Sequence, residues 1–368
     1  MNRLPQKASL VAQTADVLKE GIQADEWKQW LPGERELCDK LRVARMTLRA
    51  ALKLLRREGW IRSRPGKRTQ IIARPRRALP VVKERVLLLT PVAMEFLRPF
   101  SILWISELRE SLAQAGHHLE IYVGHALYGE KPAKALESLM RQLRPAGCVL
   151  TSSTRNLQQW FSDRRFPCVI VGSAHPGVEL PSVDIAYRAA CRHATGQFLA
   201  RGHQRLAFLN PDSGAAGDLE SERGFKEAVA QAKLATVEGV IVRHDGTVTG
   251  ICNKLDLSLS RRYPPRAWLV SRATHVLTAM GHLARRGLRL PQDVALISRD
   301  HDPFLTEMVP SVARYVVSPS GMAHRISRVV LEMVRDGFVR QTPPLIIPRF
   351  TEGETLGARA DRSPISEA

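Results

Sequence analysis

Strand-sized apolar runs alternate with amphipathic segments over most of the chain, and this alternation limits the fold more than any other feature. Runs such as RVLLLTP (85–91) and PCVIVGS (167–173) are separated by stretches in which apolar residues recur at helical spacing. Strands that alternate with helices form parallel sheets covered by helices on both faces. The units are too many for one compact sheet, so the sequence predicts an α/β fold with two lobes.

The first quarter of the chain has a different, mainly helical pattern. Residues 9–24 carry apolar side chains at helical spacing, and a second, short helix is expected from its N-cap at Gly33 to Leu41. A third helix is expected over 45–58, and two short strands then flank a turn at 65–67. Three helices followed by a two-stranded wing predict a winged helix-turn-helix domain.

The net charge of +19 is concentrated in this first quarter. Residues 1–85 contain 21 Lys and Arg against 9 Asp and Glu, a surplus of 12, whereas the other 283 residues have 34 against 27, a surplus of 7. A local basic excess favours a polyanion, either nucleic acid or an anionic membrane surface. No apolar run approaches the ~20 residues that span a bilayer, and the N-terminus has no signal-peptide pattern. We therefore expect a cytoplasmic protein with no membrane partner.

The expected third helix separates its apolar and basic side chains. Its apolar face is formed by Leu48, Ala51, Leu52 and Leu55. Off that face lie the basic residues Arg45, Arg49, Lys53 and Arg56. Taken alone, such a helix is more simply explained as a structural helix with a solvated basic face.

The segment LPGERELCDKLRVARMTLRAALKLLRREGWIRSRPGKRTQI (31–71) resembles the DNA-binding domain of the GntR family of bacterial transcription regulators. The resemblance implies that a defined set of side chains approaches double-stranded DNA: Arg35, Arg45, Thr47, Arg49, Gly66 and Lys67. The front of a recognition helix enters the major groove, where an arginine reaches guanine O6 and N7. Together with the predicted turn and wing, the resemblance favours DNA binding over a merely solvated face.

Three positions depart from the family pattern. Gly33 and Ala44 stand where the family usually has Ser, and Arg42 stands where it usually has Gly in the turn. Glycine is an acceptable N-cap, whereas Ala44 removes a hydroxyl that could cap a helix or contact phosphate.

The chain from 85 to 357 resembles the core of LacI-family repressors, which has the periplasmic-binding-protein type I fold. The segment AMGHLARRGLRLPQDVALISRDHDPFLTEMVPSVARYVV (279–317) carries the most specific part of this likeness. The resemblance implies two lobes joined by three crossovers, a small-molecule effector in the cleft between them, and a homodimer formed through the core.

The effector positions of sugar-responsive relatives are only partly retained. An arginine, an asparagine and an aspartate of those relatives fall on Ser221, Arg272 and Asp300, so only the aspartate is kept. Phe100 matches an aromatic residue that packs on the ligand, and Ser152 ends a strand facing the same cleft. Arg272 could pair with a carboxylate or phosphate of the effector, or with Asp300 in an internal ion pair that closes an empty site.

No catalytic motif of the G-x-S-x-G, Walker A or H-E-x-x-H type occurs. The five cysteines are widely spaced and include no C-x-x-C, which indicates free thiols. We therefore expect no catalytic residue, no metal site and no cofactor.

The expected organisation is a winged helix-turn-helix domain (1–74), a linker (75–84), a two-lobed effector-binding and dimerisation core (85–357) and a C-terminal tail (358–368). It predicts a ligand-responsive transcription regulator, a repressor by family resemblance, whose effector is a small molecule such as a sugar or an anionic sugar derivative. One alternative is a DNA-binding regulator with no functional effector site. The other is a solute-binding transport component, against which the winged helix argues.

Overall fold

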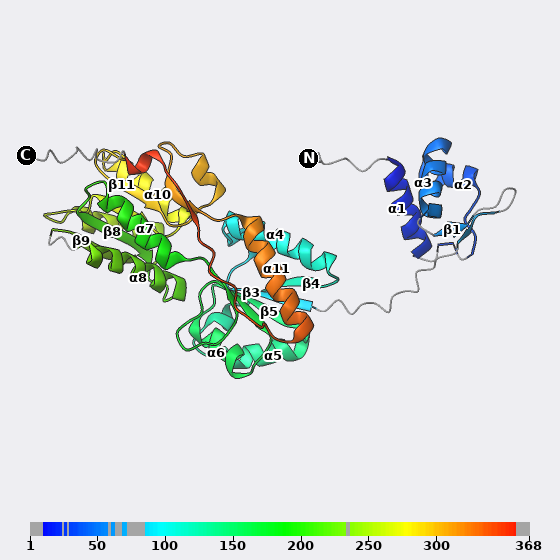
Figure 1. The fold of residues 1–368 in the computed structure, drawn as a ribbon, viewed down its shortest axis with the longest axis horizontal. Coiled ribbons are helices and arrows are strands. Elements are labelled where there is room, and N and C mark those ends of the chain that lie inside the picture. Colours follow the sequence, from blue (N-terminus) through cyan, green and yellow to red (C-terminus); the bar gives the residue numbers. More distant parts are fainter. Residues whose placement is uncertain are drawn as a thin grey trace, which may run out of the picture. The chain divides into compact units, whose positions relative to one another are not determined.

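The computed structural model describes residues 10–23, 26–27, 29–57, 60–62, 68–71, 85–232 and 236–357. The chain divides into two compact units, Met1–Lys83 and Glu84–Ala368, and each is described by itself (Figure 1). The predicted linker and C-terminal tail lie outside the described residues, as do Gly66 and Lys67.

The first unit is three helices and a short two-stranded sheet. Its elements are α1 (Leu10–Gln23), α2 (Glu34–Leu41), α3 (Arg45–Arg57), β1 (Ile61–Arg62) and β2 (Gln70–Ile71). The two strands are antiparallel. The predicted apolar face of α3 is confirmed, because Leu48, Ala51, Leu52 and Leu55 are all buried in the core of this unit. The predicted N-cap of α2 at Gly33 is also confirmed.

The turn between α2 and α3 depends on a left-handed residue. Arg42 ends α2 with a φ of 50° and a ψ of 44°. An L-residue with a side chain adopts this conformation at a cost, which glycine does not bear. The turn therefore has the geometry for which glycine is best suited, although the chain places an arginine there.

The second unit begins with a lobe built on a five-stranded parallel sheet in the order β4-β3-β5-β6-β7. The strands are β3 (Arg85–Thr90), β4 (His118–Val123), β5 (Gly147–Thr151), β6 (Cys168–Val171) and β7 (Ser182–Val183). The helices of this N-lobe are α4 (Pro99–Gln114), α5 (Ala133–Leu143), α6 (Arg155–Asp163) and α11 (Pro319–Asp336), with short 3-10 turns at Met94–Phe96 and His125–Tyr128. One apolar layer joins the sheet to α4 and α11, and another joins it to α5 and α6.

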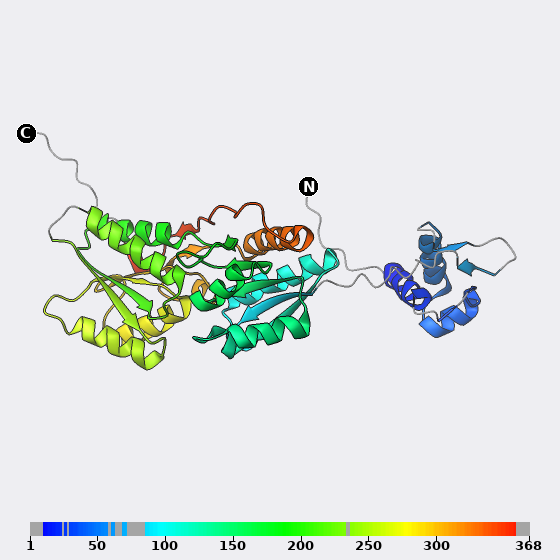
Figure 2. The same ribbon diagram turned by 90° about the horizontal axis from the view of Figure 1, so that it is seen from below.

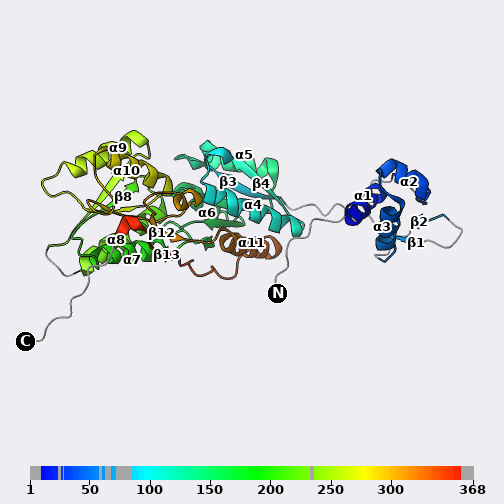
Figure 3. The ribbon, with the colours of Figure 1, turned by 90° about the horizontal axis from the view of Figure 1, so that it is seen from above.

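The other lobe has a six-stranded sheet in the order β13-β12-β11-β10-β8-β9, in which only the edge strand β13 is antiparallel. Its strands are β8 (Arg205–Pro211), β9 (Glu238–His244), β10 (Ala267–Val270), β11 (Ala295–Ser298), β12 (Ala313–Val316) and β13 (Arg349–Thr351). The helices of this C-lobe are α7 (Tyr187–Leu199), α8 (Ala216–Gln231), α9 (Val248–Leu259) and α10 (Ala273–Arg285), with 3-10 turns at Pro303–Thr306 and Glu354–Leu356. Helices α7 and α8 cover one face, and α9 and α10 cover the other (Figure 3).

In the described residues the chain passes between the lobes three times, after β7, after β12 and between α11 and β13. Two of these crossovers lie side by side, because Ile185 forms a parallel bridge with Ile346. The Ala186 amide donates to the Ile346 carbonyl at 2.9 Å, and the Ile346 amide donates to the Asp184 carbonyl at 2.8 Å. The two lobes and three crossovers expected from the LacI resemblance are thus confirmed (Figure 2).

Each of the five cysteines is a free thiol, and Cys148, Cys168 and Cys191 are buried. Burial raises the pKa of the Cys148 and Cys168 thiols far above the ordinary value, so these side chains are neutral core residues. In the part of the chain that the structure describes, no helix combines the length and hydropathy needed to cross a membrane.

Candidate functional site

The front of α3 presents basic side chains away from the core of the first unit. Arg45 and Arg49 have side chains that are 69% and 53% exposed, and Thr47 lies between them, half-buried. Arg35 is exposed on the neighbouring helix α2. The leucines of α3 are turned inward, so these four predicted DNA-binding residues are available on the outer surface. The two predicted wing residues are not among the described residues.

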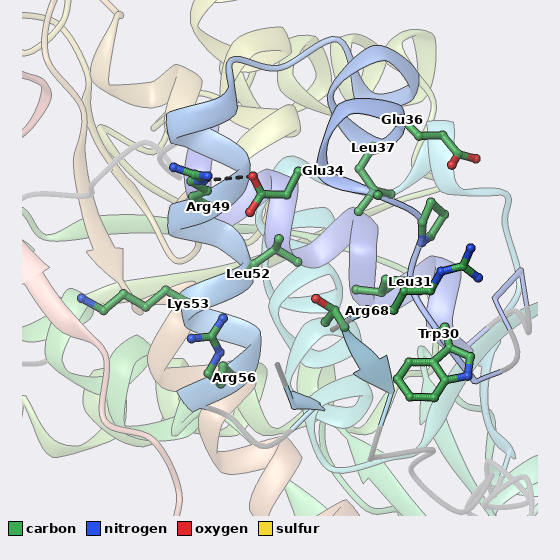
Figure 4. A pocket seen from close by; sticks show the side chains of 13 residues that line it. Trp30, Leu31, Glu34, Glu36, Leu37, Arg49, Leu52, Lys53, Arg56 and Arg68 are labelled. Carbon is green, nitrogen blue, oxygen red and sulfur yellow. Dashed lines mark hydrogen bonds and ion pairs between the residues drawn. The ribbon is translucent and has the colours of Figure 1, made fainter. Parts of the chain in front are cut away.

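Glu34 connects the two arginines of this surface. Its Oε2 accepts from Arg45 Nε at 3.1 Å and from Arg49 Nε at 2.9 Å, and Figure 4 shows the second of these contacts. Burial acts to raise the pKa of Glu34, but the hydrogen bonds from both arginines outweigh it and lower the pKa below its ordinary value. Glu34 therefore stays ionised at neutral pH and holds the two guanidinium groups beside each other.

The basic surface continues along α3 into a hollow of about 890 Å³. Lys53 and Arg56 line it from α3, and Arg68 and Trp30 line it from the segments beside the wing sheet (Figure 4). The Trp30 backbone forms a β-bridge with Gln70, and the residue is 43% exposed. Arginines and lysines along one helix side, with an exposed aromatic ring, give a surface suited to a phosphate backbone.

In the second unit the cleft between the lobes is occupied by arginine and aspartate side chains. Asp300, at the carboxyl end of β11 in the C-lobe, pairs with Arg98 of the N-lobe. Arg299 Nε donates to the same carboxylate at 3.2 Å, and Arg299 Nη1 donates to Asp218 Oδ1 at 3.0 Å. Arg272 Nη2 donates to the other oxygen of Asp218 at 2.9 Å. An ion pair therefore joins the lobes directly, and two further arginines complete the network.

This network corrects one of the two interpretations of Arg272. The arginine does form an internal ion pair, but its partner is Asp218 and not Asp300. Asp300 is already paired with Arg98 and Arg299, which the sequence analysis did not single out. The reason is geometric, because Arg272 caps α10 while Asp218 lies in the first turn of α8 and faces it.

Arg299 takes the space beside Ser221, where sugar-responsive relatives were expected to have an arginine. Its Nη1 donates to Ser221 Oγ at 2.8 Å, and its guanidinium stacks 4.2 Å from the centre of the Tyr187 ring. Burial acts to lower the pKa of Arg299, but Asp300 and Asp218 raise it well above the ordinary value. The guanidinium group beside Ser221 thus comes from the end of β11 and not from α8.

Phe100 lies at the same junction but contacts it through its backbone. The Phe100 amide, in the first turn of α4, donates to Asp302 Oδ1 of the C-lobe at 2.9 Å. Burial raises the pKa of Asp302. The remaining cavity, which Phe100 lines with Arg98, Arg299 and Asp300, has a volume of only about 20 Å³. Such a space holds about one water molecule, so the lobes are closed on each other here.

Ser152 does not join this network. It follows β5 in the N-lobe with a φ of 49° and lines a separate polar pocket of about 260 Å³. Phe100, Ser221, Arg272 and Asp300 thus belong to one set of contacts across the cleft, and Ser152 belongs to another.

The sequence-based prediction did not include four charged residues of the cleft, which are Arg98, Asp218, Arg299 and Asp302. A signal for two of them was present, since SRDHD follows a buried strand and side chains at the carboxyl ends of parallel strands gather at one edge. No local pattern marks Asp218, which occupies an ordinary first-turn position of a helix.

Comparison with known proteins agrees with both units. Residues 195–356 match the periplasmic binding protein-like domain, and residues 10–71 match the bacterial regulatory proteins of the gntR family. The structure of a LacI-family regulatory protein from Chloroflexus aggregans superposes with a TM-score of 0.66 at 20% identity, covering 75% of this chain and 99% of that one.

Two curated relatives differ in how much of the chain they match. The HTH-type transcriptional repressor PurR of Vibrio atlanticus (strain LGP32) is 23% identical over 143 residues, which are 39% of this chain and 43% of that protein. The arabinose metabolism transcriptional repressor of Geobacillus stearothermophilus is 19% identical over 341 residues, or 88% of this chain and 91% of that protein. The chain therefore spans less than half the length of the first of these relatives.

The fold and the matches together define a class of protein in which a winged helix-turn-helix domain precedes a two-lobed periplasmic-binding-protein-type core. This chain joins a domain that matches the gntR family of bacterial regulatory proteins to a core that contains a periplasmic binding protein-like domain. The family resemblances of both halves are confirmed.

Proposed function

We propose that the protein is a ligand-responsive transcription regulator, a repressor, that acts as a homodimer in the cytoplasm. The observation that carries the proposal is the exposed basic front of α3 on a helix-turn-helix domain, joined in one chain to a two-lobed core. Arg35, Arg45, Thr47 and Arg49 are the proposed contacts to operator DNA, with Gly66 and Lys67 on the wing. The relatives named above are repressors, which favours repression over activation.

Selection of bound duplexes from a random pool tests the DNA-binding part. A homodimer reads two half-sites whose separation follows its symmetry. We expect enrichment of a roughly two-fold symmetric sequence, with half-sites one helical turn or a multiple of it apart. A pool that shows no enrichment, together with binding equal to that of a random duplex, would contradict operator recognition.

We propose that the core transmits a signal through the relative position of its lobes. A small molecule that contacts both lobes stabilises the closed arrangement, and dimeric winged helices then change their spacing on DNA. Such coupling is typically ~1–3 kcal/mol. A sugar or an anionic sugar derivative is the proposed effector class, supported by the relative named for arabinose metabolism. Calorimetric titration with sugars, sugar phosphates and sugar acids, repeated with operator present, tests this proposal.

A second candidate is a DNA-binding regulator with no functional effector site. The arginine-filled cleft favours it, because the residual cavity beside Asp300 is about 20 Å³ and admits no sugar. A compound that binds the protein and changes operator affinity would rule this candidate out. We expect no catalysis from either candidate, since the relatives are transcription regulators.

A further inference from the structure

We propose that a groove at the end of the C-lobe opposite the cleft docks an acidic amphipathic helix of a partner protein. The groove has a volume of about 790 Å³, and its wall comes from the second half of α9, the loop 260–266 and the end of α10. Helices α9 and α10 lie side by side there (Figure 3). The groove includes none of the residues proposed to bind DNA or an effector.

The position of the groove separates it from the cleft. Arg266 and Leu288 line the groove and precede β10 and β11, whereas Arg272 and Asp300 of the cleft follow these same strands. Parallel strands bring their amino ends to one edge of a sheet and their carboxyl ends to the other. The length of the C-lobe strands therefore lies between the groove and the arginine network.

The floor of the groove is apolar. Leu259 and Leu288 pack against the apolar core between the sheet, α9 and α10, and Pro264 lies with them in the wall. Leu257 lies beside them and is 65% exposed. Single apolar side chains scattered on a surface are ordinary, whereas apolar side chains gathered at a hollow mark a binding surface.

The folded core of the C-lobe does not account for the exposed leucine of α9. Ile251 and Leu255 are the large apolar residues that this helix buries, and Leu257 falls off that buried side. The outer side of a surface helix normally carries polar residues. Leu257 therefore contributes little to the core, and its side chain is available to a partner.

The segments that form the groove have an excess of positive charge. Residues 253–266 and 285–293 contain seven Lys and Arg against two Asp, a surplus of five. Both aspartates form ion pairs with arginines of the same segments. In the described part of the chain, Arg261, Arg262 and Arg266 form no ion pair with a carboxylate.

The two aspartates are fully engaged by their own arginines. Asp256 accepts from Arg286 Nε, and Asp293 accepts from Arg289 Nε, each at 2.8 Å. These contacts lower the pKa of both carboxyls to about 2. Both carboxylates thus remain ionised and paired, and the charge of the loop 260–266 is left for the anionic groups of a partner.

Tyr263 extends the surface beside the groove. Its ring is 57% exposed, and the guanidinium carbons of Arg205 and Arg262 lie 5.5 and 5.3 Å from its centre. Such cation–π contacts hold the three side chains near one another before a partner binds, which reduces the entropy lost on binding. Tyrosine and arginine are also enriched in protein–protein interfaces.

An apolar floor with a basic rim distinguishes between possible occupants. Nucleic acid supplies phosphates but no aliphatic side chains for the floor. A second copy in a two-fold contact would bring the same arginines against each other. A bilayer surface is flat and does not enter a concave groove. A helix with large apolar side chains on one face and carboxylates beside them matches both the floor and the rim.

Selection of short peptides displayed on phage, with the full chain as the target, tests the inference. Random duplex DNA in excess occupies the basic surface on α3 during the selection. We expect the enriched peptides to place Leu, Ile, Phe or Trp at helical spacing and to contain several Asp and Glu. A selection that enriches no peptides of this kind would overturn the inference.

Two variants locate the binding site. Leu257→Asp and Arg266→Glu should each weaken binding of a labelled selected peptide at least tenfold in fluorescence anisotropy. Leu257→Met keeps the apolar surface, and Arg141→Glu makes the same charge change at an exposed position of α5 outside the groove, so both should bind like the parent protein. Thermal melting checks folding, and the exposed Leu257 keeps the test valid if Arg266→Glu unfolds. Equal peptide binding by the parent protein and both groove variants would contradict the proposed site.

Three further measurements identify the other occupants. Flotation with phosphatidylglycerol vesicles detects membrane binding, anisotropy with random duplex detects nucleic-acid binding, and sedimentation velocity detects self-association. We expect the two groove variants to match the parent protein in all three. A loss in one of them as large as the loss of peptide binding would assign the groove to that occupant and refute the proposal.

Discussion

At the residue scale, Glu34 competes with DNA for the arginines that are proposed to bind it. One carboxylate oxygen accepts from both Arg45 and Arg49. A phosphate or a guanine must therefore displace this oxygen before it can accept hydrogen bonds from all donors of the two guanidinium groups. A fixed anion among cations also repels phosphates that approach without the right geometry. Glu34 therefore favours recognition of a particular sequence over general attraction to DNA.

Replacing Glu34 by glutamine should strengthen binding to random duplex DNA. It should also reduce the ratio of the affinity for operator to the affinity for random sequence. The change removes one negative charge and frees two guanidinium groups, which raises non-specific attraction. We expect a several-fold gain on random duplex in fluorescence anisotropy at low salt.

Glu36→Gln is the matched control for this substitution. Glu36 lies on the same helix and lines the same hollow, so its replacement removes an equal charge without touching the Arg45–Glu34–Arg49 contacts. Equal effects of the two substitutions on the operator-to-random ratio would show that charge alone matters and that Glu34 does not position the arginines.

Arg42→Gly should stabilise the first unit. The residue has a φ of 50°, a conformation that costs a side-chain-bearing residue about 1–2 kcal/mol, and part of the gain is lost because glycine has a freer unfolded chain. We expect the free energy of unfolding of this unit to rise by a net ~0.5–1 kcal/mol. Chemical denaturation measures this change. A loss of stability would mean that the Arg42 side chain makes contacts that outweigh the backbone strain.

The sequence predicted the residues of the basic surface on α3 better than the residues of the cleft in the second unit. The GntR pattern predicted where Arg35, Arg45 and Arg49 lie, because helix spacing separates the apolar and basic sides of a helix. The role of Arg299 beside Ser221 could not be predicted, because 78 positions separate the two residues in the chain. Only tertiary packing brings the Arg299 guanidinium group to Ser221.

At the element scale, α3 combines base reading at its front with backbone attraction along its side. Arg45→Ala should weaken specific operator binding by ~1–3 kcal/mol and reduce the base preference at one position of the operator, because such an arginine reads a base edge. Lys53→Ala should weaken binding to all sequences alike and reduce the salt slope by about 1. Anisotropy titrations at several salt concentrations separate the two responses.

Arg57→Ala is the control for both, since Arg57 is exposed at the end of α3 and does not line the hollow. Operator binding by Arg45→Ala that matches the parent protein at every salt concentration would show that α3 does not read the operator through its front.

Several elements were not predicted from the sequence. Helices α6, α9 and α11 were not singled out, although apolar residues such as Ile326, Val329 and Val330 of α11 recur at helical spacing. The short strands β7, β12 and β13 hold two to four residues each, and such short strands depend on their neighbours in the sheet more than on local preference. By contrast, the buried central strands are continuous apolar runs, and these were predicted directly from the sequence.

At the scale of the whole second unit, the Arg98–Asp300 pair connects the lobes. Arg98→Ala should favour the open arrangement, since Asp300 keeps Arg299 as a partner while the link between the lobes is lost. Hydrogen bonds to charged groups contribute about 1.5–3 kcal/mol, so a measurable open population is expected. Spin labels on α5 and α9, one in each lobe, report the change as longer distances in double electron–electron resonance.

Arg141→Ala on α5 serves as the control, because Arg141 is exposed on the N-lobe surface. A distance distribution in Arg98→Ala that coincides with that of the control would show that other contacts, such as that between Phe100 and Asp302, hold the lobes without this pair.

Low pH should reduce the stability of the closed core by protonating Asp300. Burial acts to raise its pKa, but Arg299 and Arg98 outweigh burial and lower the pKa below the ordinary value. Its stabilising contribution is therefore present above the unfolded pKa of about 3.9 and is lost as pH falls through the folded pKa. Asp300→Asn should make the stability of the core less dependent on pH below about 4, measured by denaturant unfolding at several pH values.

The second crossover, after β12, also has a consequence for synthesis on the ribosome. Helix α11 supplies Met322, Ile326 and Val330 to the core of the N-lobe, and a side chain on Gly147 would collide with Met333 of this helix. The N-lobe strands therefore emerge long before the helix that covers them, and the whole C-lobe except its last strand is translated in between. Domains generally fold as units in the order of their synthesis, at about 5–20 residues per second. A nascent chain halted after 186 exposes the apolar surface that α11 later covers, and it is a natural client for a chaperone.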